Sequence, residues 1–129
     1  MTLHFINLAF RFLLEMTTLI AVGMWGWHQA DGWMRWLLAI GLPLILSTIW
    51  GVFNVPNDPS RGGGAPIPVP GIVRLLVEVL FFGSGCYVLL ALGYSSFCGV
   101  FIVLLILHYL VSFRRIEWLL GKKDQSTPL

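Results

Sequence analysis

The sequence contains few charged side chains. Asp, Glu, Lys and Arg make up 11% of its 129 residues, hydrophobic residues make up 57%, and the mean hydropathy is +0.85. Such a chain has too little polar surface to cover a water-soluble globule. We therefore expect one membrane domain over residues 1–129, with the lipid bilayer as its surroundings. The net charge of +2 is too small to indicate nucleic-acid binding.

Redox and cofactor motifs are also missing. The two cysteines, Cys86 and Cys98, do not form a Cys-x-x-Cys pattern, and we expect them at different depths, where a disulfide would be strained. The sequence has no phosphate loop, nucleophile elbow or His-Glu-x-x-His motif. The glycines at 62–64 lack the following Lys and helix of a phosphate loop and are typical of a flexible linker. We predict no metal, no cofactor and no enzyme activity.

Four long apolar runs occupy most of the chain. A membrane-spanning helix needs about 20 mostly apolar residues, and the breaks between these runs are rich in Gly, Pro, Asn or charge. We predict an all-α fold, an integral membrane four-helix bundle, with spans at about residues 5–27, 33–53, 72–93 and 97–113. The proline-rich stretch 54–71 is the loop between two helical hairpins, and residues 114–129 are a short polar tail.

Lys and Arg residues are distributed unequally over the two sides of this arrangement. Seven of the eight fall on the side that holds both termini and the central loop, and the other side has Arg35 alone. An excess of Lys and Arg marks the cytoplasmic side of a multi-pass protein. We therefore expect the N-terminus, the loop 54–71 and the tail 114–129 to be cytoplasmic.

A short phrase occurs twice inside the apolar runs. The segments Arg11-Phe12-Leu13-Leu14-Glu15 and Arg74-Leu75-Leu76-Val77-Glu78 share an Arg-x-x-x-Glu pattern at equal offsets. This pattern predicts that the two hairpins are related as an internal repeat. An unpaired charge at the centre of a membrane costs about 2.5 to 3.5 kcal/mol, so these four charges must be compensated.

Two pairings can compensate them. Residues four apart share a helix face, so Arg11 can meet Glu15, and Arg74 can meet Glu78. Alternatively, two parallel copies related by an axis along the membrane normal would bring Arg11 near Glu78 and Arg74 near Glu15. Either pairing gives a neutral network, which a low-dielectric interior tolerates. The sequence leaves both pairings open.

The second and fourth spans offer further polar groups at a similar depth. Ser47, Thr48 and His108 lie roughly 9 to 10 Å from the cytoplasmic ends of their helices at helical rise, and they form a candidate polar layer. Each also has a simpler explanation, because Ser and Thr often bond their own helix backbone and a membrane His is more often a packing residue. Pro43 is expected to kink the second helix.

Several motifs together resemble one family. They are Arg11-Phe12-Leu13-Leu14-Glu15, Gly23-Met24-Trp25-Gly26, Gly41-Leu42-Pro43, Ile49-Trp50-Gly51-Val52-Phe53, Pro70, Arg74-Leu75-Leu76-Val77-Glu78 and Phe82-Gly83. In this order they are similar to the YrdB family of bacterial membrane proteins, a domain of unknown function. The resemblance implies a four-helix protein of the bacterial cytoplasmic (inner) membrane. It implies no established reaction and no catalytic residue.

Three classes of function remain open. The favoured one is a structural or accessory protein held together by the Arg/Glu network, with a second copy or another membrane protein as partner. The alternative is a small transporter or ion pathway in which Glu15 and Glu78 change protonation, because ionisable residues inside a membrane are by default functional candidates. An intramembrane enzyme ranks lowest, because the sequence shows no nucleophile or cofactor motif.

Overall fold

The computed structural model describes residues 2–56 and 65–121, with side chains from residue 5 onward. The described part is predominantly helical, which confirms the all-α prediction at the level of fold class. Its elements, in chain order, are α1 (Thr2–Trp27), α2 (Trp33–Val52), β1 (Phe53–Asn54), β2 (Ile67–Pro68), α3 (Gly71–Ala91), α4 (Ser95–Val111) and α5 (Phe113–Leu119).

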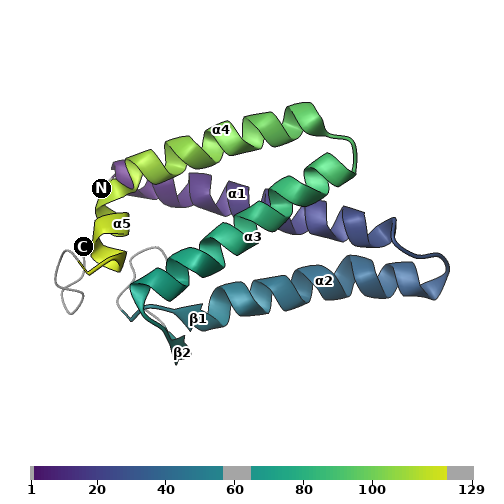
Figure 1. Cartoon of the computed structure of the whole chain (residues 1–129), viewed down its shortest axis with the longest axis horizontal. Coiled ribbons are helices and arrows are strands. Elements are labelled where there is room, and N and C mark those ends of the chain that lie inside the picture. Colours follow the sequence, from purple (N-terminus) through teal and green to yellow (C-terminus); the bar gives the residue numbers. More distant parts are fainter. Residues whose placement is uncertain (1, 57–64, 122–129) are drawn as a thin grey trace.

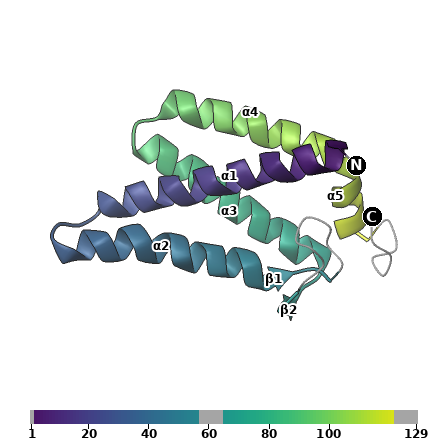
Figure 2. The ribbon, with the colours of Figure 1, turned by 180° about the vertical axis from the view of Figure 1, so that it is seen from behind.

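The four long helices run roughly lengthwise along the molecule. α1 and α3 cross face to face, with α2 along one side of the pair and α4 along the other (Figures 1 and 2). The start of α1, the short helix α5 and both strands lie at one end of the molecule, which we call the terminal end. The turns at 28–32 and 92–94 lie at the opposite end, which we call the turn end.

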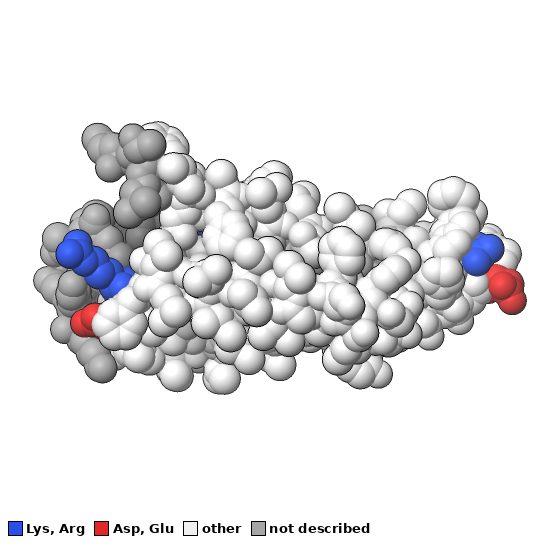
Figure 3. All heavy atoms as spheres, turned by 90° about the horizontal axis from the view of Figure 1, so that it is seen from above, with Lys and Arg blue, Asp and Glu red and all other residues white. Residues whose placement is uncertain are grey.

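Three helices are long and apolar enough to cross a membrane: Phe5–Trp27 of α1, Trp33–Val52 and Gly71–Ala91. α4 and α5 add a fourth crossing if they are counted as one broken span, since they meet at a bend of 71°. On the face shown in Figure 3, charged side chains are visible at the two ends, and the surface between them is uncharged. The structure is thus compatible with a membrane protein of three or four crossings.

Small residues allow close approach between the helices. A Cβ on Gly26 would lie 2.7 Å from the carbonyl oxygen of Leu38, so α1 and α2 pack backbone to backbone. A Cβ on Gly85 would lie 2.8 Å from the hydroxyl of Thr18, where α3 crosses α1. Pro43 lies inside α2, which continues as one helix from Trp33 to Val52.

The α1–α2 contact gives a first prediction. Gly26→Ala should destabilise the protein by about 1 to 3 kcal/mol, because the new methyl group meets backbone atoms that cannot move independently. The measurement is unfolding in mixed detergent micelles. The matched control is Gly41→Ala in α2, where a Cβ meets no atom within 4 Å. Equal stabilities for the two variants would contradict the packing described here.

The central loop contains a small element that was not expected. β1 and β2 pair in parallel, with Phe53 opposite Ile67 and Asn54 opposite Pro68, and the Val69 amide donates to the Asn54 carbonyl at 2.9 Å. This pairing brings the end of α2 and the start of α3 to the same place. The remainder of the predicted loop, residues 57–64, lies outside the described residues.

The beginning of the predicted polar tail is helical. Residues 113–119 form α5, in which Trp118 and Leu119 are 0% and 2% exposed. These two side chains share a face with Arg115, because residues three and four apart are neighbours on a helix, and they pack with Val55 and Leu75. Residues 122–129 of the tail lie outside the described part.

The expected difference in depth between the two cysteines was wrong. The thiol of Cys98 donates to the carbonyl of Cys86 at 3.5 Å. α3 and α4 are antiparallel about the turn at 92–94, and these residues are almost equally far from that turn, so they reach the same level. Both cysteines are free thiols.

Candidate functional site

A fully buried carboxylate lies near the terminal end of the helices. Glu78 of α3 is 0% exposed, and its Oε2 accepts from Arg115 Nη2 at 2.6 Å and from Arg74 Nε at 3.1 Å. Its Oε1 accepts from Arg115 Nη1 at 3.1 Å and from the Tyr109 hydroxyl at 2.6 Å. Arg11 Nη2 forms an ion pair with Oε2 at 3.2 Å. One carboxylate therefore joins α1, α3, α4 and α5.

Arg11 connects this carboxylate to the rest of α1 and to α4. Its Nε lies 3.4 Å from Glu15 Oε1, and its Nη1 lies 3.2 Å from His108 Nε2. With Nη2 on Glu78, each guanidinium nitrogen has a different neighbour. A planar guanidinium points its three nitrogens in different directions, so one side chain can lie against three polar groups. We call Arg11, Glu15, Arg74, Glu78 and Arg115 the charged cluster.

α2 is attached to the charged cluster through its backbone. Arg74 Nη1 donates to the carbonyls of Trp50 and Phe53 at 2.7 and 2.8 Å. The last carbonyls of a helix have no partner inside it, and a cation there also meets the negative end of the helix dipole. The Trp50 ring lies beside two guanidinium carbons, at 4.2 Å from that of Arg74 and 5.0 Å from that of Arg11, within range of a cation–π interaction.

A chain of neutral polar groups extends from Arg11 toward the terminal end. His108 Nδ1 lies 3.1 Å from Asn7 Oδ1, and Asn7 Nδ2 donates to the Ser112 hydroxyl at 2.9 Å. His108 is 1% exposed, with the Phe10 and Tyr109 rings against it. These hydrogen bonds form a second link between α1 and α4, in addition to the charged cluster.

The structure brings together all four charges of the repeated phrase. Both in-helix pairs are present, Arg11 with Glu15 and Arg74 with Glu78. Of the pairs between the two phrases, the structure has Arg11 with Glu78. Both pairs of the first alternative are thus present, together with the Arg11–Glu78 pair of the second.

The three residues of the predicted polar layer have different surroundings in the structure. His108 contacts the charged cluster through Arg11, whereas the hydroxyls of Ser47 and Thr48 both donate to the carbonyl of Leu44, at 3.1 and 2.7 Å. For these two side chains the simpler explanation holds, namely that Ser and Thr hydroxyls bond the backbone of their own helix. α2 packs Leu42, Leu46 and Trp50 against the helix core, and neither Ser47 nor Thr48 belongs to this stripe.

Three contributors were not identified from the sequence. Arg115 makes the shortest ion pair with Glu78, Tyr109 gives a hydroxyl, and Asn7 orients His108. In the sequence alone, Arg115 is one of the positive charges that flank the fourth span. Its spacing to Trp118 and Leu119 was the available signal, because it places a charge on the apolar face of a short helix.

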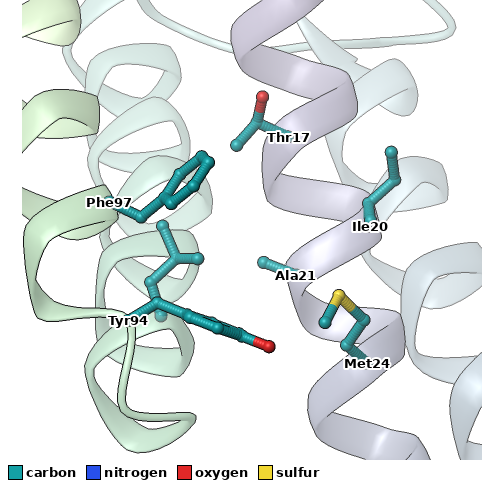
Figure 4. A pocket seen from close by; sticks show the side chains of 7 residues that line it. Thr17, Ile20, Ala21, Met24, Tyr94 and Phe97 are labelled. Carbon is teal, nitrogen blue, oxygen red and sulfur yellow. The ribbon is translucent and has the colours of Figure 1, made fainter.

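The turn end offers a different kind of surface. A groove of about 400 Å³ opens between α1 and the corner where α3 meets α4. In Figure 4, Tyr94 and Phe97 face α1 across this groove, toward Thr17, Ala21 and Met24. None of its lining residues is charged; they are Thr17, Ile20, Ala21, Met24, Leu89, Tyr94 and Phe97.

The geometry of the charged cluster supports ion pairing. The charged cluster holds two carboxylates against three guanidinium groups, and no group of three or more His, Cys, Asp or Glu there could hold a metal ion. Breaking a buried ion pair by removing one partner typically costs about 3 to 5 kcal/mol, because the other charge stays buried. The arrangement is therefore suited to fixing helices relative to one another.

Comparison with known proteins places the chain among relatives of similar length. Residues 9–106 match the model of a family described as "Protein of unknown function (DUF2568)". The chain is 40% identical over 116 residues to the "Uncharacterized protein YrdB" of Bacillus subtilis (strain 168), covering 90% of this chain and 94% of that protein. No solved structure matches. The chain thus belongs to this family of unknown function, which confirms the resemblance to YrdB.

Proposed function

We propose that the protein is a structural or accessory protein of the bacterial cytoplasmic membrane, without enzyme activity. In this proposal four spans form two hairpins related as an internal repeat, with both termini cytoplasmic. The charged cluster then lies in the cytoplasmic half of the bilayer and joins the helices there. The observation that carries the proposal is Glu78, a fully buried carboxylate with contacts from four helices.

Burial of the ion pairs supports a structural role. The side chains of Arg74 and Glu78 are 0% exposed and that of Arg11 is 3% exposed. An ion or substrate that passed through Glu78 would have to separate it from three guanidinium groups and a hydroxyl. Since each broken contact leaves a charge or donor without its partner in a low-dielectric interior, such a step is costly.

The apolar stretch between the charged cluster and the turn end also supports this role. A polar solute that left the charged cluster toward the turn end would next meet helices whose described side chains there are predominantly apolar, including the groove in Figure 4. A single chain thus gives such a solute charged partners over only half of the bilayer.

The proposed accessory surface is the outward face of α5. Phe113 and Leu120 are 56% and 45% exposed, and Arg114 is exposed beside them. Because α5 turns by 71° from α4, it would lie along the cytoplasmic membrane surface, where apolar side chains enter the acyl boundary and a cation meets anionic headgroups. A second copy of this chain or another membrane protein could dock on the same face.

Transport remains the second candidate because of Glu15. Its side chain is 12% exposed, in contrast to the 0% of Glu78, so it is the carboxylate of the cluster that a proton could reach. In this alternative Glu15 and Glu78 would be the protonatable groups of an ion pathway. The two candidates differ in what the loss of Glu15 would do.

Proton flux into liposomes separates the two candidates. The purified protein is reconstituted with an internal pH-sensitive dye, and a pH gradient is imposed with and without membrane potential. The structural proposal predicts flux equal to that of protein-free liposomes for both the parent and Glu15→Gln. Flux in the parent that Glu15→Gln abolishes, at an unchanged melting temperature, would overturn the structural proposal in favour of transport.

A further inference from the structure

We infer that His108 acts as a neutral hydrogen-bond acceptor for Arg11, and that its protonation releases α1 from α4 at the terminal end. This inference rests on the proposed structural role of the charged cluster and adds a conformational device to it. The evidence for it is which of the groups next to His108 can donate a hydrogen bond and which can accept one.

The position of the imidazole proton follows from its two neighbours. Arg11 Nη1, 3.2 Å from His108 Nε2, can only donate, so Nε2 must accept and carries no proton. A neutral imidazole then has its proton on Nδ1, which donates to Asn7 Oδ1 at 3.1 Å. Asn7 in turn donates through Nδ2 to Ser112. Every hydrogen bond in this chain has one donor and one acceptor only in this tautomer.

Reversing the Asn7 amide does not provide a second solution. If Asn7 Nδ2 faced His108, both ring nitrogens would have to accept, and a neutral imidazole has only one acceptor nitrogen. The amide orientation and the tautomer therefore fix each other.

Protonation would turn the acceptor into a donor. With a proton on Nε2, an imidazolium N–H would point at a guanidinium N–H across 3.2 Å, so a hydrogen bond becomes a repulsive contact between two cations. Since the ring is 1% exposed, water cannot easily enter between them. Moving α4 away from α1 would relieve this contact.

The charged groups around the ring also oppose its protonation. Arg11 of α1 contacts the ring, and Arg115 of α5 reaches Glu78 of α3, which also pairs with Arg11. From α4, the Tyr109 phenol donates to Glu78. A positive ring would lie against Arg11, whereas the carboxylates of the cluster, Glu15 and Glu78, already pair with guanidinium groups. Acid on the terminal side should thus loosen the α1–α4 contact.

Nitrogen NMR on labelled histidine tests the tautomer directly. The variant His4→Gln with His28→Gln leaves His108 as the sole histidine and leaves the charged cluster unaltered. At neutral pH we expect one protonated nitrogen, Nδ1, and one unprotonated nitrogen, Nε2. An imidazolium signal or the opposite tautomer at neutral pH would overturn the inference without any change at His108 itself.

Thermal unfolding tests the release. Between about pH 8 and pH 5, the range in which an exposed histidine titrates, the unfolded chain takes up a proton that the buried ring resists, so the melting temperature of the parent should fall by about 4 °C or more. His108→Gln keeps an acceptor oxygen but cannot take up a proton, so its melting temperature should fall less over the same range. Equal pH dependence in the two proteins would overturn the inference.

Failure of the His108 inference can be distinguished from failure of the proposed function. If the charged cluster does not hold the helices together, removing its ion pairs changes stability little at every pH. If only the His108 inference is wrong, the ion pairs still contribute to stability, and that contribution does not depend on His108.

Discussion

Glu78→Gln is expected to destabilise the protein by about 3 to 5 kcal/mol, because it leaves three guanidinium groups buried without their carboxylate. The amide keeps the shape of the side chain and can accept at one oxygen only. The measurement is the free energy of unfolding in mixed detergent micelles, together with the yield of folded protein after size-exclusion chromatography.

Glu15→Gln is the matched control for this change. It removes the same charge from the same cluster, but Glu15 is 12% exposed, and its ion pair with Arg11 is longer, at 3.4 Å. Its loss of stability should be clearly smaller. If the two variants lose equal stability, or if Glu78→Gln is as stable as the parent, Glu78 is not the group that joins the helices.

Gly71→Ala should have the second largest effect. Gly71 is the first residue of α3, and a Cβ there would overlap the backbone carbonyl of Leu119 at the end of α5 and lie 2.8 Å from its Cα. Backbone cannot move aside as a flexible side chain can, so α5 would have to leave α3. Overpacking of this kind costs about 1 to 3 kcal/mol, and the displaced helix would also withdraw Arg115 from Glu78.

The control and the second readout for Gly71→Ala use the same helix. Gly83→Ala adds a methyl group to α3 at a site with no atom within 4 Å, and its stability should stay near that of the parent. In the Gly71→Ala background, removing Arg115 should cost little, because the ion pair with Glu78 is already lost. A full additional loss would show that α5 had stayed in place, contrary to the packing described.

Hydropathy was sufficient to locate the helices. The four apolar runs became α1 to α4 with boundaries shifted by a few residues, because a continuous apolar stretch between Gly, Pro or charged breaks has few alternatives. The Arg-x-x-x-Glu phrase also indicated which charges meet, since residues four apart on a helix must lie on one face. These features depend on local sequence and could be predicted.

The contribution of Arg115 depends on packing between distant segments. Its burial requires α5 to turn back against α3, and this turn requires a glycine at position 71, forty-four residues earlier in the chain. In the same way, helical rise places Ser47 and Thr48 along α2, but their hydroxyls bond the carbonyl of Leu44 in their own helix. Depth follows from helical rise, whereas the rotation of each helix about its axis is fixed by its neighbours.

The most direct test of the account is a double-mutant cycle between Arg115 and Glu78, using Arg115→Gln, Glu78→Gln and both together. Their contacts at 2.6 and 3.1 Å predict a coupling free energy of about 1 to 3 kcal/mol. Arg114, exposed and adjacent in sequence, gives the control cycle, for which we expect additivity. If the Arg115 cycle is also additive within about 0.5 kcal/mol, the buried cluster does not hold this fold together.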